Sequence, residues 1–304
     1  MSDHSTSRRK LLQGLGLAAT ALLADPVQAL SEAEGPLDDA LQTLLQNHYQ
    51  RMSKEEVLQA LARIERRALR EHGVTLQCRD TPPIPGVTFA FALNLSKCKG
   101  GRQCVAACVG ENNGNRDGTT ENIRVLAMPH GERDLAKGDH YYHPQTTPQP
   151  GTWYLPIQCQ QCEDPPCVQA CPVEATWREA DGIVVIDYDW CIGCRYCAVA
   201  CPYWARRFNW KKPELPSEKI TTETHYLGNR PRSAGVMEKC TFCIQRTRKA
   251  LFPACQEACP TGARIFGNLL DPEGEIRYIL ENKTIFRLKE ELSTQPKFWY
   301  FTDV

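Results

Sequence analysis

Cysteine is the residue type with the clearest chemical potential in this 304-residue chain. Of its sixteen cysteines, fifteen fall into four groups, and every group closes with two cysteines separated by three residues. Disulfide-rich frameworks usually stabilise domains that are too small to build a core, and a chain of this length does not need them. The grouping therefore indicates metal ligation, because thiolates are ligands for zinc and for iron-sulfur clusters.

The third group has the most specific spacing. It consists of Cys191, Cys194, Cys197 and Cys201, followed by Pro202. This run matches the bacterial spacing for a [4Fe-4S] cluster, in which the first three cysteines ligate one cluster and the fourth ligates another. Gly193 allows the backbone to approach the sulfurs. We expect the fourth cysteine to lead into a helix, with Pro202 in its first turn.

The second and fourth groups are longer versions of the same pattern. They consist of Cys159, Cys162, Cys167 and Cys171, and of Cys240, Cys243, Cys255 and Cys259. Both keep the opening C-x2-C and the closing C-x3-C-P of the third group. The longer middle is tolerable because the entropy of loop closure grows slowly with loop length.

Crossing over of the fourth cysteine pairs the second group with the third and, by elimination, the first with the fourth. The predicted ligand sets are Cys159, Cys162 and Cys167 with Cys201; Cys191, Cys194 and Cys197 with Cys171; Cys240, Cys243 and Cys255 with Cys108; and Cys98 and Cys104 with Cys259. The last of these sets is one ligand short.

The shortfall arises in the first group. It contains Cys98, Cys104 and Cys108, with Gly101 at the position of the second ligand. We expect the sixteenth cysteine, Cys78, to replace that ligand; the alternatives are a three-iron cluster, a ligand other than cysteine, or a buried thiol that ligates nothing. We therefore expect four iron-sulfur clusters, at least three of them [4Fe-4S]. The fourth is [4Fe-4S] if Cys78 ligates, with [3Fe-4S] as the alternative.

Structural zinc is the main competing metal, because C-x2-C pairs also ligate zinc. Zinc would not explain a third cysteine two residues further on and a fourth before a proline. The chain also lacks G-x-S-x-G, H-E-x-x-H and phosphate-loop motifs, so we predict no catalytic residue. A structural zinc-binding assembly factor and an iron-sulfur enzyme with an incompletely ligated cluster are the alternative functions.

Short strands are expected to position these groups. Apolar residues alternate over 87–95, which predicts a strand that runs into Cys98. Similar segments, TWYLPIQC and GIVVIDYDWC, end at Cys159 and Cys191. Long connections rich in Pro, Thr and Gly lie between the units. Two roles are open for a group of aromatic and basic residues, docking of a partner or packing under the long loops: Trp204, Arg206, Arg207, Trp210 and Arg246.

The amino terminus predicts export. Arg8 and Arg9 precede a mildly apolar segment over 11–24 and the small-residue pattern VQA, which ends at Ala29. This arrangement is typical of a twin-arginine signal peptide, here spanning 1–29. The twin-arginine route moves proteins that are already folded around a cofactor.

A helical extension is expected over 30–77. Helical spacing of apolar residues predicts one helix over 37–52, and the capping box from Ser53 to Glu56 predicts the start of a second helix that stops at Gly73. Basic and acidic residues balance at 36 each, so the net charge gives no reason to expect binding to nucleic acid.

With these motifs placed, residues from about 87 to 304 resemble the four-cluster ferredoxin-like subunits of the complex iron-sulfur molybdoenzyme superfamily, especially those of polysulfide-reductase and formate-dependent nitrite-reductase systems. The resemblance is carried by CQQCEDPPCVQACPVEATW, DGIVVIDYDWCIGCRYCAVACPYWARRFNW and GVMEKCTFCIQRTRKALFPACQEACPTGARIFGNLLD. The chain departs from the family pattern at Gly101 and Cys78.

The resemblance implies an α+β fold with two bacterial-ferredoxin-like modules in a pseudo-twofold arrangement, long loop insertions and the helical extension in front. The first module would combine 78–145 with 235–304, and the second would span 146–234. The resemblance also implies a periplasmic electron-transfer subunit with no catalytic site of its own. Electrons would pass through its four clusters between a quinone-reactive membrane subunit of the polysulfide-reductase type and a periplasmic catalytic subunit, either a molybdoenzyme or a multihaem cytochrome.

Overall fold

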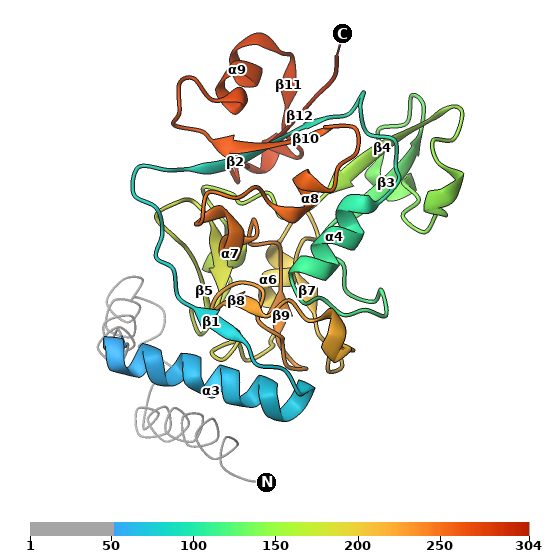
Figure 1. Cartoon of the computed structure of the whole chain (residues 1–304). Coiled ribbons are helices and arrows are strands. Elements are labelled where there is room, and N and C mark those ends of the chain that lie inside the picture. Colours follow the sequence, from blue (N-terminus) through green and yellow to red (C-terminus); the bar gives the residue numbers. More distant parts are fainter. Residues whose placement is uncertain (1–51, 304) are drawn as a thin grey trace, which may run out of the picture. The chain divides into compact units, whose positions relative to one another are not determined.

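A computed structural model describes residues 52–303 of the chain (Figure 1). From Glu56 onward the residues form one compact unit. In chain order its helices and strands are α3 (Lys54–His72), β1 (Gln77–Arg79), β2 (Phe89–Asn94), α4 (Gln103–Glu111), β3 (Arg124–Pro129), β4 (Thr152–Ile157), α5 (Pro166–Gln169), β5 (Thr176–Arg178), β6 (Val184–Ile186), α6 (Tyr196–Ala200), β7 (Arg207–Phe208), β8 (Glu223–His225), β9 (Met237–Glu238), α7 (Ile244–Thr247), α8 (Ala254–Glu257), β10 (Arg264–Asn268), α9 (Glu275–Asn282), β11 (Ile285–Phe286) and β12 (Phe298–Phe301). Short 3-10 helices lie at Leu135–Lys137, Pro144–Thr146, Ser217–Lys219 and Glu290–Leu292.

The largest sheet has four strands in the order β10-β2-β12-β11 (Figure 1). Its strand β2 confirms the strand predicted from the alternation over 87–95, although all six of its residues are buried. Phe91 packs with the aromatic residues on one face of the sheet, whereas Ala90 and Ala92 contact Ile276 and Ile279 of α9 on the other. Small side chains on that second face leave room for the helix.

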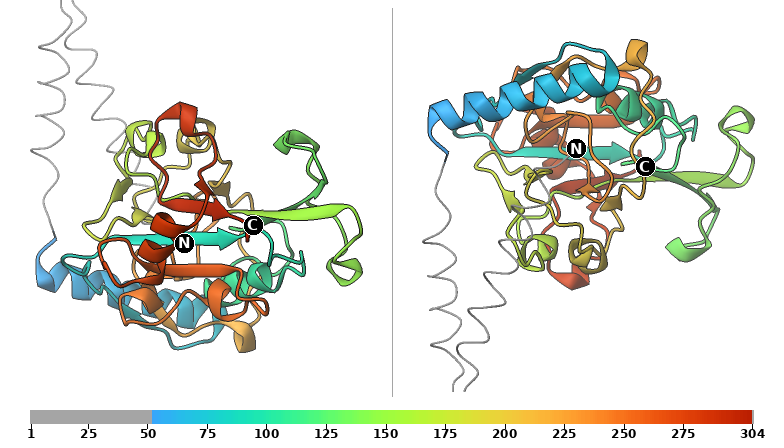
Figure 2. Two further views of the ribbon diagram at one scale, coloured as in Figure 1. Left: turned by 90° about the horizontal axis from the view of Figure 1, so that it is seen from above. Right: turned by 90° about the horizontal axis from the view of Figure 1, so that it is seen from below.

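The described residues also form four two-stranded sheets. The pairs β3–β4, β5–β6 and β7–β9 are antiparallel, whereas β1–β8 is parallel. The predicted strands before Cys159 and Cys191 correspond to β4 and β6. Both views in Figure 2 show the green β3–β4 pair extending beyond the four-stranded sheet.

Mixed helices and small sheets agree with the predicted α+β class. The pairs β3–β4 and β7–β9 each join a strand from 78–145 or 235–304 to a strand from 146–234. Two strand pairs therefore cross the boundary between the predicted modules. The division into these modules and their pseudo-twofold arrangement stay predictions.

The prediction that the fourth cysteine of a group leads into a helix is wrong. In the last three groups the short helices α5, α6 and α8 contain the third cysteine and end before the fourth. The three residues between these two cysteines make up about one helical turn, so the third and fourth cysteines stay near each other while they belong to different sets. Pro202 follows the end of α6, where the missing N–H group breaks no helical hydrogen bond.

Helix α3 confirms the second helix predicted for the extension. It ends at Gly73, which adopts a φ of 69° and donates its N–H to the carbonyl of Leu69. The buried residues of α3 include Ile64 and Ala68, which pack against Leu76. The signal peptide over 1–29 and the helix over 37–52 lie outside the described residues. No helix within 52–303 is both long enough and apolar enough to span a bilayer.

Candidate cluster-binding sites

The cysteines of the second and third groups come together with their fourth members exchanged. Cys201 joins the second group, and the resulting set lines one small cavity. Cys171 joins the third group and lines another. Set C consists of Cys159, Cys162, Cys167 and Cys201, and set D consists of Cys171, Cys191, Cys194 and Cys197. These are the sets that the crossover predicted.

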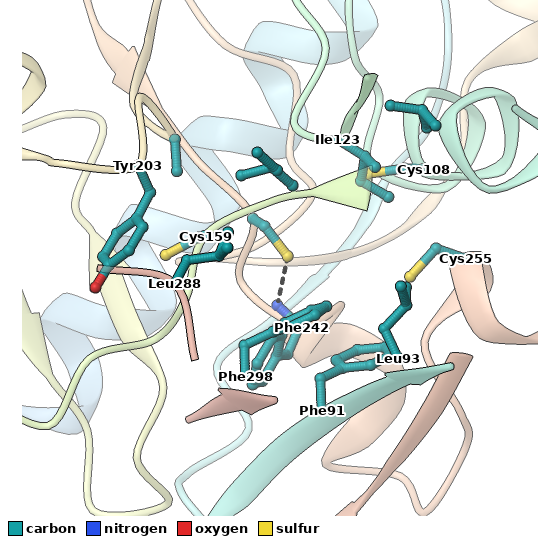
Figure 3. Packing of buried hydrophobic residues seen from close by; sticks show 14 of the residues in the cluster. Phe91, Leu93, Cys108, Ile123, Cys159, Tyr203, Phe242, Cys255, Leu288 and Phe298 are labelled. Carbon is teal, nitrogen blue, oxygen red and sulfur yellow. Dashed lines mark hydrogen bonds between the residues drawn. The ribbon is translucent and has the colours of Figure 1, made fainter. Parts of the chain in front are cut away.

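The first and fourth groups exchange members in the same way. Set B consists of Cys108, Cys240, Cys243 and Cys255. Burial raises the pKa of Cys108 well above its usual value, and the other three members of set B add to this rise. The Asn112 amide nitrogen lies 3.6 Å from Cys108 Sγ and 3.5 Å from Cys243 Sγ, so it spans the set. Figure 3 shows Cys108 and Cys255 within the buried aromatic and aliphatic core.

Set A consists of Cys98, Cys104 and Cys259, which line a cavity of about 200 Å³. Gly101 lies on the wall of this cavity, as its position in the spacing requires. Tyr142 donates a hydrogen bond of 2.7 Å from its hydroxyl to the carbonyl of Gly100, which fixes the loop. The structure therefore brings three thiols, and no fourth, to this cavity wall.

Cys78 is not brought to set A. It lies on β1, where it pairs with Thr224 of β8 and packs against Ile64 and Leu76. Its backbone N–H donates to a Glu65 carboxylate oxygen at 3.0 Å. Parallel pairing of β1 with β8 holds the residue in this separate cluster, so the arrangement does not support the expectation that Cys78 replaces the ligand missing at Gly101.

The four sets follow one another in the order A, B, C, D. Burial raises the pKa of Cys255 to about 12, and Cys104 of set A contributes to this rise. Burial also raises the pKa of Cys240 to about 12, and Cys159 of set C is the cysteine that adds most. At the last junction, burial raises the pKa of Cys197 to about 11, with a contribution from Cys167 of set C. Each set therefore contains a cysteine that lies near a cysteine of the next set.

Comparison with known proteins agrees with these sets. The sequence profile of a 4Fe-4S dicluster domain matches residues 151–232 and 225–269. A subunit of the selenate reductase from Mesobacillus selenatarsenatis is 32% identical, with 98% of each chain covered. The chain belongs to the family of iron-sulfur subunits of reductase complexes.

Other members of this family are similar over a smaller share of the chain. The iron-sulfur cluster-binding subunit of menaquinone reductase from Nitratidesulfovibrio vulgaris is 36% identical over 71% of this chain and 89% of its own length. A subunit of the tetrathionate reductase from Salmonella typhimurium is 33% identical over 71% of this chain and 73% of its own length. The match to the selenate reductase protein extends further, over nearly the whole chain.

Buried arginines test whether iron-sulfur clusters fit these sets. Arg206 Nη2 lies 3.0 Å from Cys167 Sγ, while its Nε and Nη1 are buried without a protein acceptor. Arg264 Nη2 is also buried without an acceptor. Unpaired buried N–H groups are costly, and the sulfur atoms of an anionic cluster are acceptors of the right charge. The residues present therefore fit the clusters that the family implies.

Backbone amides point at the sulfurs as well. The N–H of Phe242 lies 3.4 Å from Cys240 Sγ, and the N–H of Met237 lies 3.5 Å from Cys191 Sγ. Hydrogen bonds of this kind stabilise ligated sulfur and adjust its potential. Among the described residues, no three His, Cys, Asp or Glu side chains converge as ligands of a single metal ion would.

Of the two roles left open for Arg206, docking or packing, its burial favours packing, because only 6% of the residue is exposed. Trp204 and Trp210 do lie at the surface, at 49% and 74% exposure. Sequence reasoning also missed Arg264. A repeated signal could have found both arginines, because the motif C-P-x2-A-R begins at Cys201 and again at Cys259.

Proposed function

We propose that this chain is an exported electron-transfer subunit whose clusters form a chain in the order A, B, C, D. The observation that carries the proposal is the distribution of exposure along this order. All cysteines of the middle sets B and C are buried, whereas all of set A and two members of set D, Cys171 and Cys194, are partly exposed. Electrons therefore have an entry at one end and an exit at the other. When bound, iron-sulfur clusters supply one-electron redox chemistry.

The protein supplies spacing, exclusion of water and hydrogen bonds to sulfur. Buried sets B and C are shielded from solvent, so electrons within them are not lost to outside acceptors. Partner subunits belong at the two ends. We propose a quinone-reactive membrane subunit and a periplasmic catalytic subunit, either a molybdoenzyme or a multihaem cytochrome. The names of the relatives, which are subunits of reductases, support a multi-subunit complex.

Exposed apolar side chains around set D support docking at that end. Ile192, Tyr196 and Val199 lie between the cysteines of the third group and are 51%, 62% and 87% exposed. Clusters of exposed apolar residues commonly mark protein interfaces. The twin-arginine pattern at Arg8 and Arg9 supports a periplasmic location, with the subunit held at the membrane through its partner.

We further propose that set A holds a [3Fe-4S] cluster and the other sets hold [4Fe-4S] clusters. Three thiols reach the set A cavity, and Gly101 stands where a fourth ligand would come from. Cys98, Cys104 and Cys259 would hold three irons, and residue 101 supplies no thiol that would hold a fourth.

Anaerobic purification of the exported protein tests the proposal. We expect about fifteen irons per chain, an electron paramagnetic resonance (EPR) signal of a three-iron cluster in the oxidised state, and co-purification of a membrane subunit and a catalytic subunit from solubilised membranes. Zinc in place of iron would instead support the assembly factor. Substrate turnover by the isolated chain would support the iron-sulfur enzyme.

A further inference from the structure

Seven Lys and Arg side chains are buried among residues 52–303. Those with a carboxylate partner are Arg230, Arg232, Arg248 and Lys297. The remaining three, Arg206, Lys239 and Arg264, form no ion pair with any carboxylate in the described part of the chain. Burying a charge without a counter-charge is costly, so these three cations need a different anionic partner.

Arg264 lies where sets A and B meet. Its Nη1 is 3.8 Å from Cys255 Sγ of set B, and its side chain also lines the cavity of set A. Although burial alone would lower the pKa of Arg264, Cys104 of set A and Cys255 of set B raise it. The side-chain oxygen Oε1 of Gln158 accepts a hydrogen bond of 2.6 Å from Nη1 and holds the guanidinium in place.

Arg206 occupies the corresponding place between sets C and D. Its Nη2 lies 3.0 Å from Cys167 Sγ of set C and donates to Thr176 Oγ1 at 2.9 Å. Burial raises the pKa of Cys197 of set D, and the charge of Arg206 is the largest effect that opposes this rise. Arg206 and Arg264 follow the fourth cysteine of their groups at the same distance in sequence, so the two junctions are built alike.

Lys239 lies where sets B and C meet. It directly precedes Cys240 of set B, and its charge opposes the rise that burial causes in the pKa of that thiol. Its Nζ donates to the carbonyl of Cys240 at 2.7 Å and to the side-chain oxygen of Gln161 at 3.4 Å. Gln161 belongs to the loop between Cys159 and Cys162 of set C. Lys239 is therefore attached to the ligand loops of both sets.

We propose that Arg264, Lys239 and Arg206 are junction cations, each the shared counter-charge of the two clusters beside it. The inference rests on the proposed function and assigns to these residues the control of potentials along the chain of clusters. A fixed positive charge in a buried, low-dielectric site favours the reduced state of an adjacent cluster and so raises its midpoint potential. Placed between two clusters, it attracts an electron on either one and so offsets part of the repulsion between electrons on neighbouring clusters.

Potentiometric titration followed by EPR on the anaerobically purified full-length protein tests this inference. Arg206→Gln should shift the midpoint potentials of the clusters in sets C and D to more negative values and leave set A unchanged. Arg264→Gln should do the reverse, shifting sets A and B and leaving set D unchanged. Lys239→Met should shift sets B and C. The conservative variant Arg206→Lys keeps the charge and should restore most of the potential.

The matched control is Arg248→Gln, which removes an equally buried cation that is paired with Asp181 and Glu179. It should leave all four potentials unchanged. Unaltered potentials in Arg206→Gln at full iron content, or an equal shift in Arg206→Lys, would overturn the inference. Loss of the clusters in Arg206→Gln together with normal clusters and potentials in Arg206→Lys supports it. A wild-type chain that binds no iron contradicts the proposed function instead.

Discussion

The loop from Cys98 to Cys104 has room for one more ligand at Gly101. A Cβ atom built on Gly101 would approach only the side chain of Gln103, at 2.5 Å from Oε1, and the end of that side chain can rotate away. The backbone of Gly101 is not in the left-handed region, so a cysteine causes no strain there.

Gly101→Cys should therefore convert the proposed three-iron cluster of set A into a four-iron cluster. We expect the three-iron EPR signal of the oxidised protein to disappear and the iron content to rise by about one per chain. Gly110→Cys, which adds a thiol within α4 with no neighbouring atom in contact, is the control and should retain the signal. A three-iron signal of wild-type size in Gly101→Cys would contradict the proposal for set A.

Cys78 offers the complementary experiment. Because its side chain packs against Ile64 and Leu76, Cys78→Ala should leave the iron content unchanged and lower the free energy of unfolding by about 1 to 2 kcal/mol through lost packing. Iron analysis and denaturant titration measure the two effects. Cys98→Ala is the comparison that should lose iron. Loss of iron from Cys78→Ala would instead show that Cys78 is a cluster ligand.

At this scale the sequence predicted how fifteen of the sixteen cysteines gather into sets, because the spacing within a group is local and the crossover of the fourth cysteine follows from it. It did not predict the place of Cys78, which depends on the pairing of β1 with β8, two strands far apart in the sequence. Arg206 illustrates the same limit. Nothing in its immediate neighbours distinguishes a buried counter-charge from a surface arginine until the repeat at Arg264 is noticed.

At the scale of elements, β4 supports the ligand loop of set A through close packing at Gly100. This residue has a φ of 78°, and a Cβ atom there would lie 2.4 Å from the ring of Tyr154 on β4. The ring is buried in the core and has no space into which to move. The strand and the ligand loop therefore fit together only when residue 100 has no side chain.

Gly100→Ala should displace this loop and impair cluster binding at set A. We expect loss of the set A EPR signal together with a lower melting temperature. Gly118→Ala is the matched control, because Gly118 has a φ of 75° and no atom near its Cβ position. That control carries only the backbone strain, about 1 to 2 kcal/mol. Identical behaviour of the two variants would show that Tyr154 does not constrain the loop.

The positions of helices and strands were harder to predict than the gathering of the cysteines into sets. The strands before Cys98, Cys159 and Cys191 were found because apolar alternation is a local property. The short helices α5, α6 and α8 were placed on the wrong side of the fourth cysteine. Each has four or five residues, too few to form a helix without tertiary packing, so their positions depend on the cysteine sets.

On the scale of the whole molecule, the clusters would cross-link distant segments. Set A joins Cys98 to Cys259, and set B joins Cys108 to Cys255. Without iron, the cysteine thiols and the junction cations would be buried without partners. Most helices and strands of the described residues are also short. In such sites the free energy of metal binding contributes directly to the free energy of folding.

Extraction of the iron with an oxidant and a chelator should therefore destabilise the whole unit. We expect lost near-ultraviolet circular dichroism and rapid proteolysis in the connections over 140–152 and 211–235, with recovery after anaerobic reconstitution with iron and sulfide. An apoprotein as resistant to protease as the reconstituted protein would show that the polypeptide alone maintains the fold.

The order of the sets could not be obtained from the sequence. Spacing gave the pairing of groups but not which ends of the two pairs meet, because that depends on how β3–β4 and β7–β9 join the two halves. Only the folded arrangement places Cys240 near Cys159 and so joins the two pairs of cysteine sets into one series.

The interleaved sets also constrain how the protein is made. All cysteines of sets C and D lie within residues 159–201, whereas sets A and B must wait until Cys255 and Cys259 have been translated. During synthesis, the cysteines of sets C and D would thus leave the ribosome before those that complete sets A and B. Factors that deliver iron and sulfide would first meet a polypeptide that contains the cysteines of sets C and D alone. They could fill sets A and B only after Cys259 has been translated.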